Sequence, residues 1–136
     1  MYVLAADTDA MQCVFAGSAL WLDCSSLVQP IDSLVQVSWY RRDELLYYQY
    51  WFDGRVLGYP PNSTNAFMFA ARATSQRVGQ VNIWPVAPNE DGVYRCDVIM
   101  ADSTHNGQHL KRTKTFSVFV CEYSTFQIFH SVICFS

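Results

Sequence analysis

The stretch Asp91-Gly92-Val93-Tyr94-Arg95-Cys96-Asp97-Val98 decides how this sequence folds. Successive side chains of an extended strand point to opposite faces, so Tyr94, Cys96 and Val98 are expected to share one face. Residues 88–92 (PNEDG) are rich in turn-forming types, so this strand is expected to follow a turn. The stretch therefore predicts a half-buried strand with a cysteine on its core side.

Several other short runs show the same alternation and are bounded by turn residues. Together they predict strands over 17–24, 35–42, 45–52, 66–71, 79–86, 93–98 and 115–120. The residues expected to face the core from the first two runs are Leu20, Leu22, Cys24, Val35, Val37 and Trp39. No stretch keeps helical periodicity for three turns, so the sequence predicts an all-β sandwich.

The order Gly17-x-x-Leu20-x-Leu22-x-Cys24, then Trp39, then Asp91-x-x-Tyr94-x-Cys96 resembles the immunoglobulin superfamily. The resemblance implies a disulfide between Cys24 and Cys96 that crosses two sheets, with Trp39 packed against it. It also implies that Tyr94 returns its hydroxyl to the backbone at the corner before its strand. The long interval between Trp39 and Cys96 resembles the variable (V) type, with Greek-key topology. The core residues that the resemblance implies are Trp39, Tyr94, Leu22 and Asp91.

Two features depart from the family pattern. Many V-type domains pair an arginine at the start of a later strand with the aspartate that Asp91 matches, but the corresponding place here is near Asn65 and Ala66. Arg41 lies two residues after Trp39 and would face the same way, so it is expected to pair with Asp91 instead. The last strand lacks the Gly-x-Gly bulge of antigen receptors, which argues against an antibody or T-cell-receptor segment.

Three segments are similar to the first domain of invertebrate neuronal surface receptors of the sidestep and beaten-path type. They are 37–42 (VSWYRR), 47–50 (YYQY) and 91–98 (DGVYRCDV). This resemblance implies an extracellular receptor domain for recognition or adhesion that binds another immunoglobulin-superfamily domain, of the same or a different protein, in axon guidance. Three alternatives stay open: a junctional adhesion or immune co-receptor domain, a secreted immune-type recognition molecule or decoy, and a structural spacer.

The expected contact surface is the sheet face that carries the third strand, the strand after it and the last two strands. This surface is commonly used for binding in V-type domains, and the aromatic residues of 45–52 fall on both faces in either register. Tyrosine, tryptophan and arginine are frequent among the residues that dominate binding energy. The candidate contact residues are Tyr40, Arg42, Tyr47, Tyr48, Tyr50 and Trp51. The polar loop 101–108 is a second candidate.

The five cysteines include no Cys-x-x-Cys pair, which favours disulfides over a zinc or redox site. Cys13 and Cys121 are candidates for a second bridge, because the first and last strands of V-type domains run side by side. Free thiols are the competing interpretation, and Cys134 has no assigned partner. The sequon at Asn62 predicts an exposed N-glycosylation site on a secreted protein or on the extracellular side of the plasma membrane.

The composition excludes several classes of function. The net charge of −3 disfavours nucleic acid as a partner. The basic residues Lys111, Arg112 and Lys114 lie on an expected edge strand, where lysines discourage unwanted strand pairing. No motif for a catalytic site, a cofactor or a small-molecule substrate occurs, so no enzyme is expected. No metal site is expected either, because His105, His109 and Asp102 lie in a loop and not on a helix.

The length of 136 residues and the 51% hydrophobic content fit one folded domain. We expect this domain to span 14–120, with an N-terminal extension over 1–13 and a C-terminal tail over 121–136. Neither end carries an apolar run long enough for a signal peptide or a membrane span. The chain is therefore expected to be one domain of a longer protein, with no membrane insertion by this segment.

Overall fold

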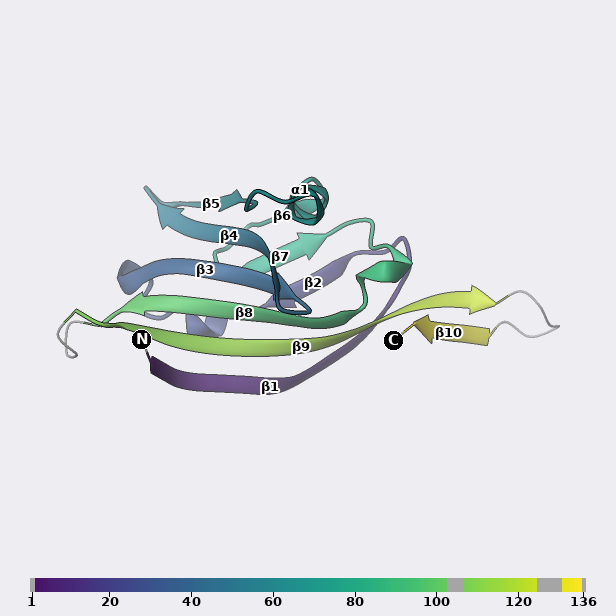
Figure 1. Ribbon diagram of the computed structural model, residues 1–136, viewed down its shortest axis with the longest axis horizontal. Helices are drawn as coiled ribbons and strands as arrows, with labels where there is room; N and C mark the ends of the chain where they lie inside the picture. The colour runs from purple at the N-terminus through teal and green to yellow at the C-terminus, as the bar shows by residue number, and fades with distance from the viewer. Residues whose placement is uncertain (1, 103–106, 125–130, 136) are drawn as a thin grey trace.

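The computed structural model describes the backbone of residues 2–102, 107–124 and 131–135, and the side chains of residues 11–102 and 107–122. Within these residues the chain forms two facing β-sheets (Figure 1). In spatial order the path of the larger sheet is β1 (Tyr2–Phe15), β9 (His109–Ser124), β8 (Gly92–Ala101), β3 (Leu34–Arg41), β4 (Glu44–Phe52) and β5 (Arg55–Tyr59). The smaller sheet consists of β2 (Leu20–Asp23), β7 (Gln80–Ile83) and β6 (Ala73–Thr74).

The connections between the sheets confirm the predicted sandwich. β1 runs parallel to β9, and the other described strand pairs are antiparallel. The chain passes from β2 in the small sheet to β3 in the large one, and returns from β5 to β6 and β7 before it enters β8. This crossing of strands between two sheets is the Greek-key arrangement of a V-type immunoglobulin sandwich, with β4 and β5 as the two additional strands.

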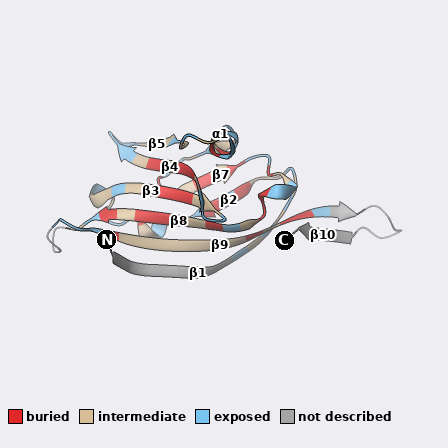
Figure 2. Cartoon of the chain, in the orientation of Figure 1, coloured by how far each residue is buried: buried red, intermediate tan, exposed pale blue. Residues whose placement is uncertain are grey.

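The core lies where the two sheets face each other, and Figure 2 shows the buried residues concentrated on the strands that line this space. Trp39 is at its centre, with its ring centroid 6.1 Å from that of Phe116. Leu20, Leu22 and Tyr94 are also buried there. Each fully buried side chain of this size contributes about 1.5–3 kcal/mol, so these residues hold the two sheets together.

Strand β3 departs from the simple alternation that the sequence predicts. Val37 and Trp39 are buried as expected, but Val35 is 39% exposed. The pairing of β3 with β8 shifts between Leu34 and Gln36, and an irregularity of this kind rotates the residues before it relative to those after it. The prediction that Val35 faces the core is therefore wrong.

Residues 66–71 form most of a helix and not the predicted strand. Helix α1 (Thr64–Ala70) begins after Ser63, whose Oγ accepts a hydrogen bond from the backbone N–H of Ala66 at 3.1 Å. Such a side-chain cap satisfies one of the free N–H groups at a helix start. Ala66 and Phe69 are buried three positions apart, and this helical spacing puts one face of α1 against the sandwich. Three short 3₁₀ turns, η1 (Ser25–Leu27), η2 (Ile31–Ser33) and η3 (Pro88–Glu90), complete the described elements.

Strand pairing extends past both expected domain limits. The pairing of β1 with β9 begins at Tyr2, well before residue 14. Beyond residue 120, β9 continues to Ser124 and pairs with β10 (Ser131–Phe135). The N-terminal extension and the C-terminal tail therefore add strands to the edge of the large sheet (Figure 1).

Candidate recognition face

Two disulfides tie the strands together. Cys24 and Cys96 join the small sheet to the large one, with their Cα atoms 6.7 Å apart. Cys13 in β1 and Cys121 in β9 form the second bridge, with a Cα separation of 6.5 Å. Cys134 lies opposite Cys121 in the pairing of β10 with β9, and its side chain lies outside the described residues.

The turn before β8 is fixed by Tyr94. Its hydroxyl donates a hydrogen bond of 2.6 Å to the backbone carbonyl of Glu90. Burial raises the pKa of the Tyr94 hydroxyl above its usual value, because the ionised form would lose its hydration. The structure thus contains the tyrosine corner that the family resemblance implies.

Glu90, the last residue of η3, carries a buried carboxylate that pairs with two arginines. Arg72 donates from both terminal nitrogens to its two oxygens, and the Nη2 to Oε2 distance is 2.7 Å. Arg41 approaches the same carboxylate, with 3.4 Å between Nη1 and Oε2. The side-chain hydrogen bonds to Glu90 raise the pKa of Arg72. A bidentate pair of this kind fixes both side chains more firmly than a single contact does.

The expected pair between Arg41 and Asp91 is wrong. Asp91 is buried and accepts instead from Arg42, with 2.9 Å between Nη2 and Oδ1. The arginine that opens the later strand is Arg72, which lies directly before β6 and not near Asn65, because helix α1 occupies residues 64–70 and moves the strand downstream. Its carboxylate partner is Glu90, the residue directly before Asp91.

Gln49 is a fully buried polar residue that the sequence reasoning missed. Its Oε1 accepts hydrogen bonds from Trp39 Nε1 at 2.8 Å and from the backbone N–H of Gly79 at 3.0 Å. Its Nε2 donates to Ser75 Oγ at 2.8 Å and to the carbonyl of Gln80 at 2.7 Å. One side chain therefore connects the indole at the centre of the core to the loop that leads into β7.

The register of β4 divides its aromatic residues into two sets. Tyr47 lies on the core side with Gln49, is 7% exposed, and packs against Phe69 with ring centroids 5.9 Å apart. A Cβ atom added at Gly58 would overlap the Tyr47 hydroxyl, so β5 covers this ring closely. The prediction that Tyr47 is a contact residue is therefore wrong, since the alternation that buries Gln49 also buries Tyr47.

Trp51 follows the same core-side alternation but lies where β4 extends past the core. It is 39% exposed and lines a pocket at the end of the sandwich. It therefore does not share a face with Tyr48 and Tyr50. Arg42, also expected as a contact residue, lies in the turn between β3 and β4 and is engaged by Asp91.

Tyr48 and Tyr50 lie on the outer face of the large sheet, where a third ring joins them. The ring centroids of Tyr48 and Tyr50 are 6.4 Å apart, and those of Tyr50 and Tyr59 are 6.2 Å apart. The Tyr50 hydroxyl donates to Gln36 Oε1 at 3.2 Å, and Gln36 Nε2 donates to Ser38 Oγ at 2.6 Å. Tyr59 was not predicted, although the Asp53-Gly54 turn sets the register that places it opposite Tyr48.

A charged cluster continues this surface toward β8. The guanidinium carbon of Arg95 lies 4.1 Å from the centre of the Tyr40 ring, and the same side chain pairs with Asp97 at 3.1 Å and with Asp43 at 2.7 Å. Asp97 also accepts from Thr113 Oγ1 at 3.0 Å. Arg95 and Asp97 alternate with the inward-facing Tyr94 and Cys96, so the sequence pattern could have identified both as outward-facing.

The strand pairing places the rings and charges on one continuous surface. One row of directly opposed residues crosses five strands of the large sheet: Tyr59, Tyr48, Ser38, Asp97 and Thr113. We call the outer surface formed by Tyr40, Tyr48, Tyr50, Tyr59, Arg95 and Asp97 the recognition face. Its tyrosines offer apolar area with a polar end, and Arg95 is already held between a ring and a carboxylate.

Other candidates from the sequence lie away from this face. Asn62 is exposed in the segment between β5 and α1. In the loop 101–108, residues 103–106 lie outside the described residues, and His105 with them. Among the described residues, no group of three or more His, Cys, Asp or Glu side chains could hold a metal ion, and no helix could cross a bilayer.

Comparison with known proteins identifies the fold. No protein-family model and no curated protein sequence matches the chain. Murine CRIg has 14% identity and a TM-score of 0.60, with 82% of this chain and 92% of that one covered. The V domain of amphioxus IgVJ-C2 has 16% identity and a TM-score of 0.54, covering 80% and 98%.

A third solved structure comprises immunoglobulin domains 1–4 of Sidekick-1. It has 17% identity and a TM-score of 0.51, with 89% of this chain and 25% of that one covered. The match thus spans about the length of one of its four domains. These likenesses, together with the crossing disulfide and the strand order, show that the chain has the immunoglobulin V-type fold.

Proposed function

We propose that this chain is an extracellular recognition domain that binds another immunoglobulin-superfamily domain through the recognition face. The observation that carries the proposal is the row of tyrosines on the outer side of β4 and β5, continuous with the Arg95 and Asp97 cluster. Rigid aromatic side chains lose little conformational entropy on binding, and they are frequent at the centres of interfaces. A sheet that served only as a spacer would not need this composition on its solvent side.

The electrostatics of the recognition face also support a protein partner. Asp97 is buried beneath its neighbours, and Arg95 is oriented by Tyr40 on one side and by two carboxylates on the other. A charged group that is already oriented loses less freedom when a partner covers it. Arg95 and its exposed partner Asp43 therefore present both signs of charge beside the tyrosine rings, which favours a protein with a matching charge pattern over a lipid surface or nucleic acid.

The disulfides support an extracellular location, because such bonds persist in oxidising compartments. Within this function, the narrower assignment to neuronal receptors of the sidestep and beaten-path type, acting in axon guidance, depends on the three sequence segments named above. Among the compared structures, immunoglobulin domains of Sidekick-1 share the fold. We assign no catalytic activity, cofactor or small-molecule substrate to the chain.

The proposal is tested by a binding screen of the chain against receptor ectodomains displayed on cells. We expect an immunoglobulin-domain partner whose binding falls at least about tenfold in Tyr48→Ser and Tyr50→Ser, which corresponds to about 1.4 kcal/mol. Trp21→Ser is the matched control, because Trp21 is exposed on the outer side of the small sheet. Circular dichroism verifies that each variant is folded.

Two results would overturn the proposal. The first is a screen that returns only carbohydrate or lipid ligands. The second is an immunoglobulin-domain partner whose affinity is unchanged in both tyrosine variants and lowered in Trp21→Ser. The latter would move the binding surface to the opposite sheet.

A further inference from the structure

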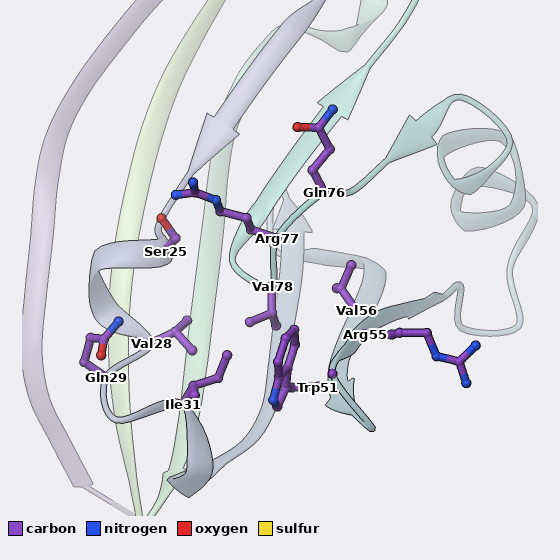
Figure 3. Close-up of a pocket in the computed structure, with 11 residues that line it drawn as sticks. Ser25, Val28, Gln29, Ile31, Trp51, Arg55, Val56, Gln76, Arg77 and Val78 are labelled. Carbon is purple, nitrogen blue, oxygen red and sulfur yellow. The ribbon is translucent and has the colours of Figure 1, made fainter.

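A pocket of about 620 Å³ opens at one end of the sandwich (Figure 3). Three connections form it: the segment after β2, the turn between β4 and β5, and the loop before β7. Its volume lies within the range of pockets that hold ligands in other proteins. None of the six residues of the recognition face lines it: the lining comes from loops, from Trp51 on the core side of β4, and from Arg55 and Val56 at the start of β5.

The floor of the pocket is apolar. Figure 3 shows the side chains of Val28, Ile31 and Val78 gathered beside the indole of Trp51. Val28 and Val78 are buried members of the core, whereas Trp51 is exposed at the mouth. This arrangement exposes the end of the hydrophobic core to an incoming apolar group, which would be removed from water on binding.

The rim of the pocket is cationic. Arg55 and Arg77 are exposed, and neither forms an ion pair with a described residue. By contrast, Arg41, Arg42, Arg72 and Arg95 all pair with carboxylates, and Arg112 donates to backbone carbonyls. None of the eleven described lining residues is an aspartate or glutamate. Of the three described arginines without a carboxylate partner, Arg112 binds backbone carbonyls, and the other two, Arg55 and Arg77, line this pocket.

Polar contacts hold the walls in place. Arg112 donates from Nη1 to the carbonyls of Leu27 at 2.9 Å and of Gln29 at 2.7 Å, which anchors one wall. Gln49 holds the opposite wall through Ser75 and Gln80. Walls that are fixed before binding lower the entropy cost of ordering them around a ligand.

We propose that this pocket binds an extended peptide segment of a partner protein, in which an apolar side chain is flanked on both sides by acidic residues. The apolar side chain would lie against Trp51 and the valines, and the flanking carboxylates would approach Arg55 and Arg77. The amide side chains of Gln29 and Gln76, which also line the pocket, can pair with peptide backbone groups.

The geometry favours such a segment over other anionic ligands. In Figure 3, Arg77 extends toward Ser25, whereas Arg55 lies beyond Trp51 and extends away from it. The two guanidinium groups therefore do not converge on a point where one phosphate could bind both. A floor of valine and isoleucine also disfavours a sugar ring, because its hydroxyls would be buried without hydrogen-bond partners.

The test is selection of a displayed random peptide library on the immobilised chain, with depletion against a Trp51→Ser variant. We expect enrichment of peptides that carry an apolar residue between aspartates or glutamates. A synthetic peptide from this set should bind Trp51→Ser and Arg77→Glu at least about tenfold more weakly than the original chain. A variant with both Arg55→Glu and Arg77→Glu should instead select peptides with lysine or arginine at the flanking positions.

Tyr48→Ser is the control that separates this site from the recognition face. It should bind the selected peptide with unchanged affinity, while Trp51→Ser should retain the immunoglobulin-domain partner. The inference is overturned if no peptide is enriched, if the enriched peptides lack acidic residues, or if they bind Trp51→Ser and Arg77→Glu as tightly as the original chain. Binding of an acidic glycan array without any peptide enrichment would also overturn it.

Discussion

At the scale of single residues, Gln49 is the polar group on which the centre of the core depends. Replacement by leucine keeps the volume but leaves the Trp39 Nε1–H, the Gly79 N–H and the Gln80 carbonyl without this partner. Each unsatisfied buried group costs about 1–3 kcal/mol. We therefore expect Gln49→Leu to lower the free energy of unfolding by about 3–5 kcal/mol, as measured by equilibrium denaturation in guanidinium chloride.

Gln76→Leu is the matched control for this prediction, since Gln76 is exposed in the adjacent loop. A surface change of this kind should alter the free energy of unfolding by no more than about 0.5 kcal/mol. Equal effects of the two substitutions would contradict a special role for the buried glutamine. A red shift of tryptophan fluorescence in folded Gln49→Leu would report water reaching the Trp39 indole.

Single residues also show where sequence reasoning is strong and where it fails. Cys24, Trp39 and Cys96 could be directed inward from alternation alone, because each continues the spacing of the buried residues before it: Leu22, Val37 and Tyr94. The partners of Glu90 could not be derived, because the bond with Arg72 depends on a helix that the sequence pattern did not indicate. The sequence also could not show which face of β4 points to the core, since aromatic residues occupy both of its faces.

At the scale of elements, helix α1 gives the clearest case in which tertiary structure overrides a strand-like pattern. The start of α1 overlaps the sequon Asn62-Ser63-Thr64. Ser63 caps the helix, whereas Thr64 completes the glycosylation motif. Ser63→Ala removes the helix cap but keeps the asparagine and threonine of the sequon. We expect it to cost about 1 kcal/mol and to lower the melting temperature by roughly 3–5 °C, as measured by calorimetry.

Thr64→Ala has the opposite effect on the same segment. It keeps the Ser63 cap and removes the threonine that glycosylation requires. In protein secreted from eukaryotic cells, we expect Ser63→Ala to retain a glycan at Asn62 and Thr64→Ala to lose it, as measured by intact mass before and after glycosidase treatment. If glycosidase treatment leaves the mass of Ser63→Ala unchanged, Asn62 is not modified.

The strands differ in how much of them could be predicted. In β2, Leu20 and Leu22 are buried while Trp21 and Asp23 are exposed, as strict alternation requires. The N-terminal part of β3 does not follow this alternation, because its pairing with β8 is irregular. The sequence of one strand does not show where its pairing with another strand becomes irregular. The alternation of a short run thus predicts a face well where the ladder is regular, and poorly where two strands slip past each other.

At the scale of the whole molecule, the bridge between Cys13 and Cys121 closes a loop that contains nearly all of the sandwich. A force applied between the two chain ends would pass through this bridge. The bypassed loop spans 108 positions, so its release would add roughly 36 nm of chain at about 3.3–3.6 Å per residue.

We therefore expect single-molecule pulling from the two ends to show no extension of this size while the disulfides are closed. Only the part of β1 before Cys13 and the chain after Cys121 can then extend, because the covalent bond holds the remaining strands together. With both disulfides reduced by dithiothreitol, the same force should release roughly 36 nm in addition. A Cys134→Ser background keeps the fifth cysteine out of the measurement. Cys24–Cys96 still locks 72 of the 108 positions, so release of roughly 12 nm or more between residues 13 and 121 of oxidised protein would show that Cys13 and Cys121 are not joined.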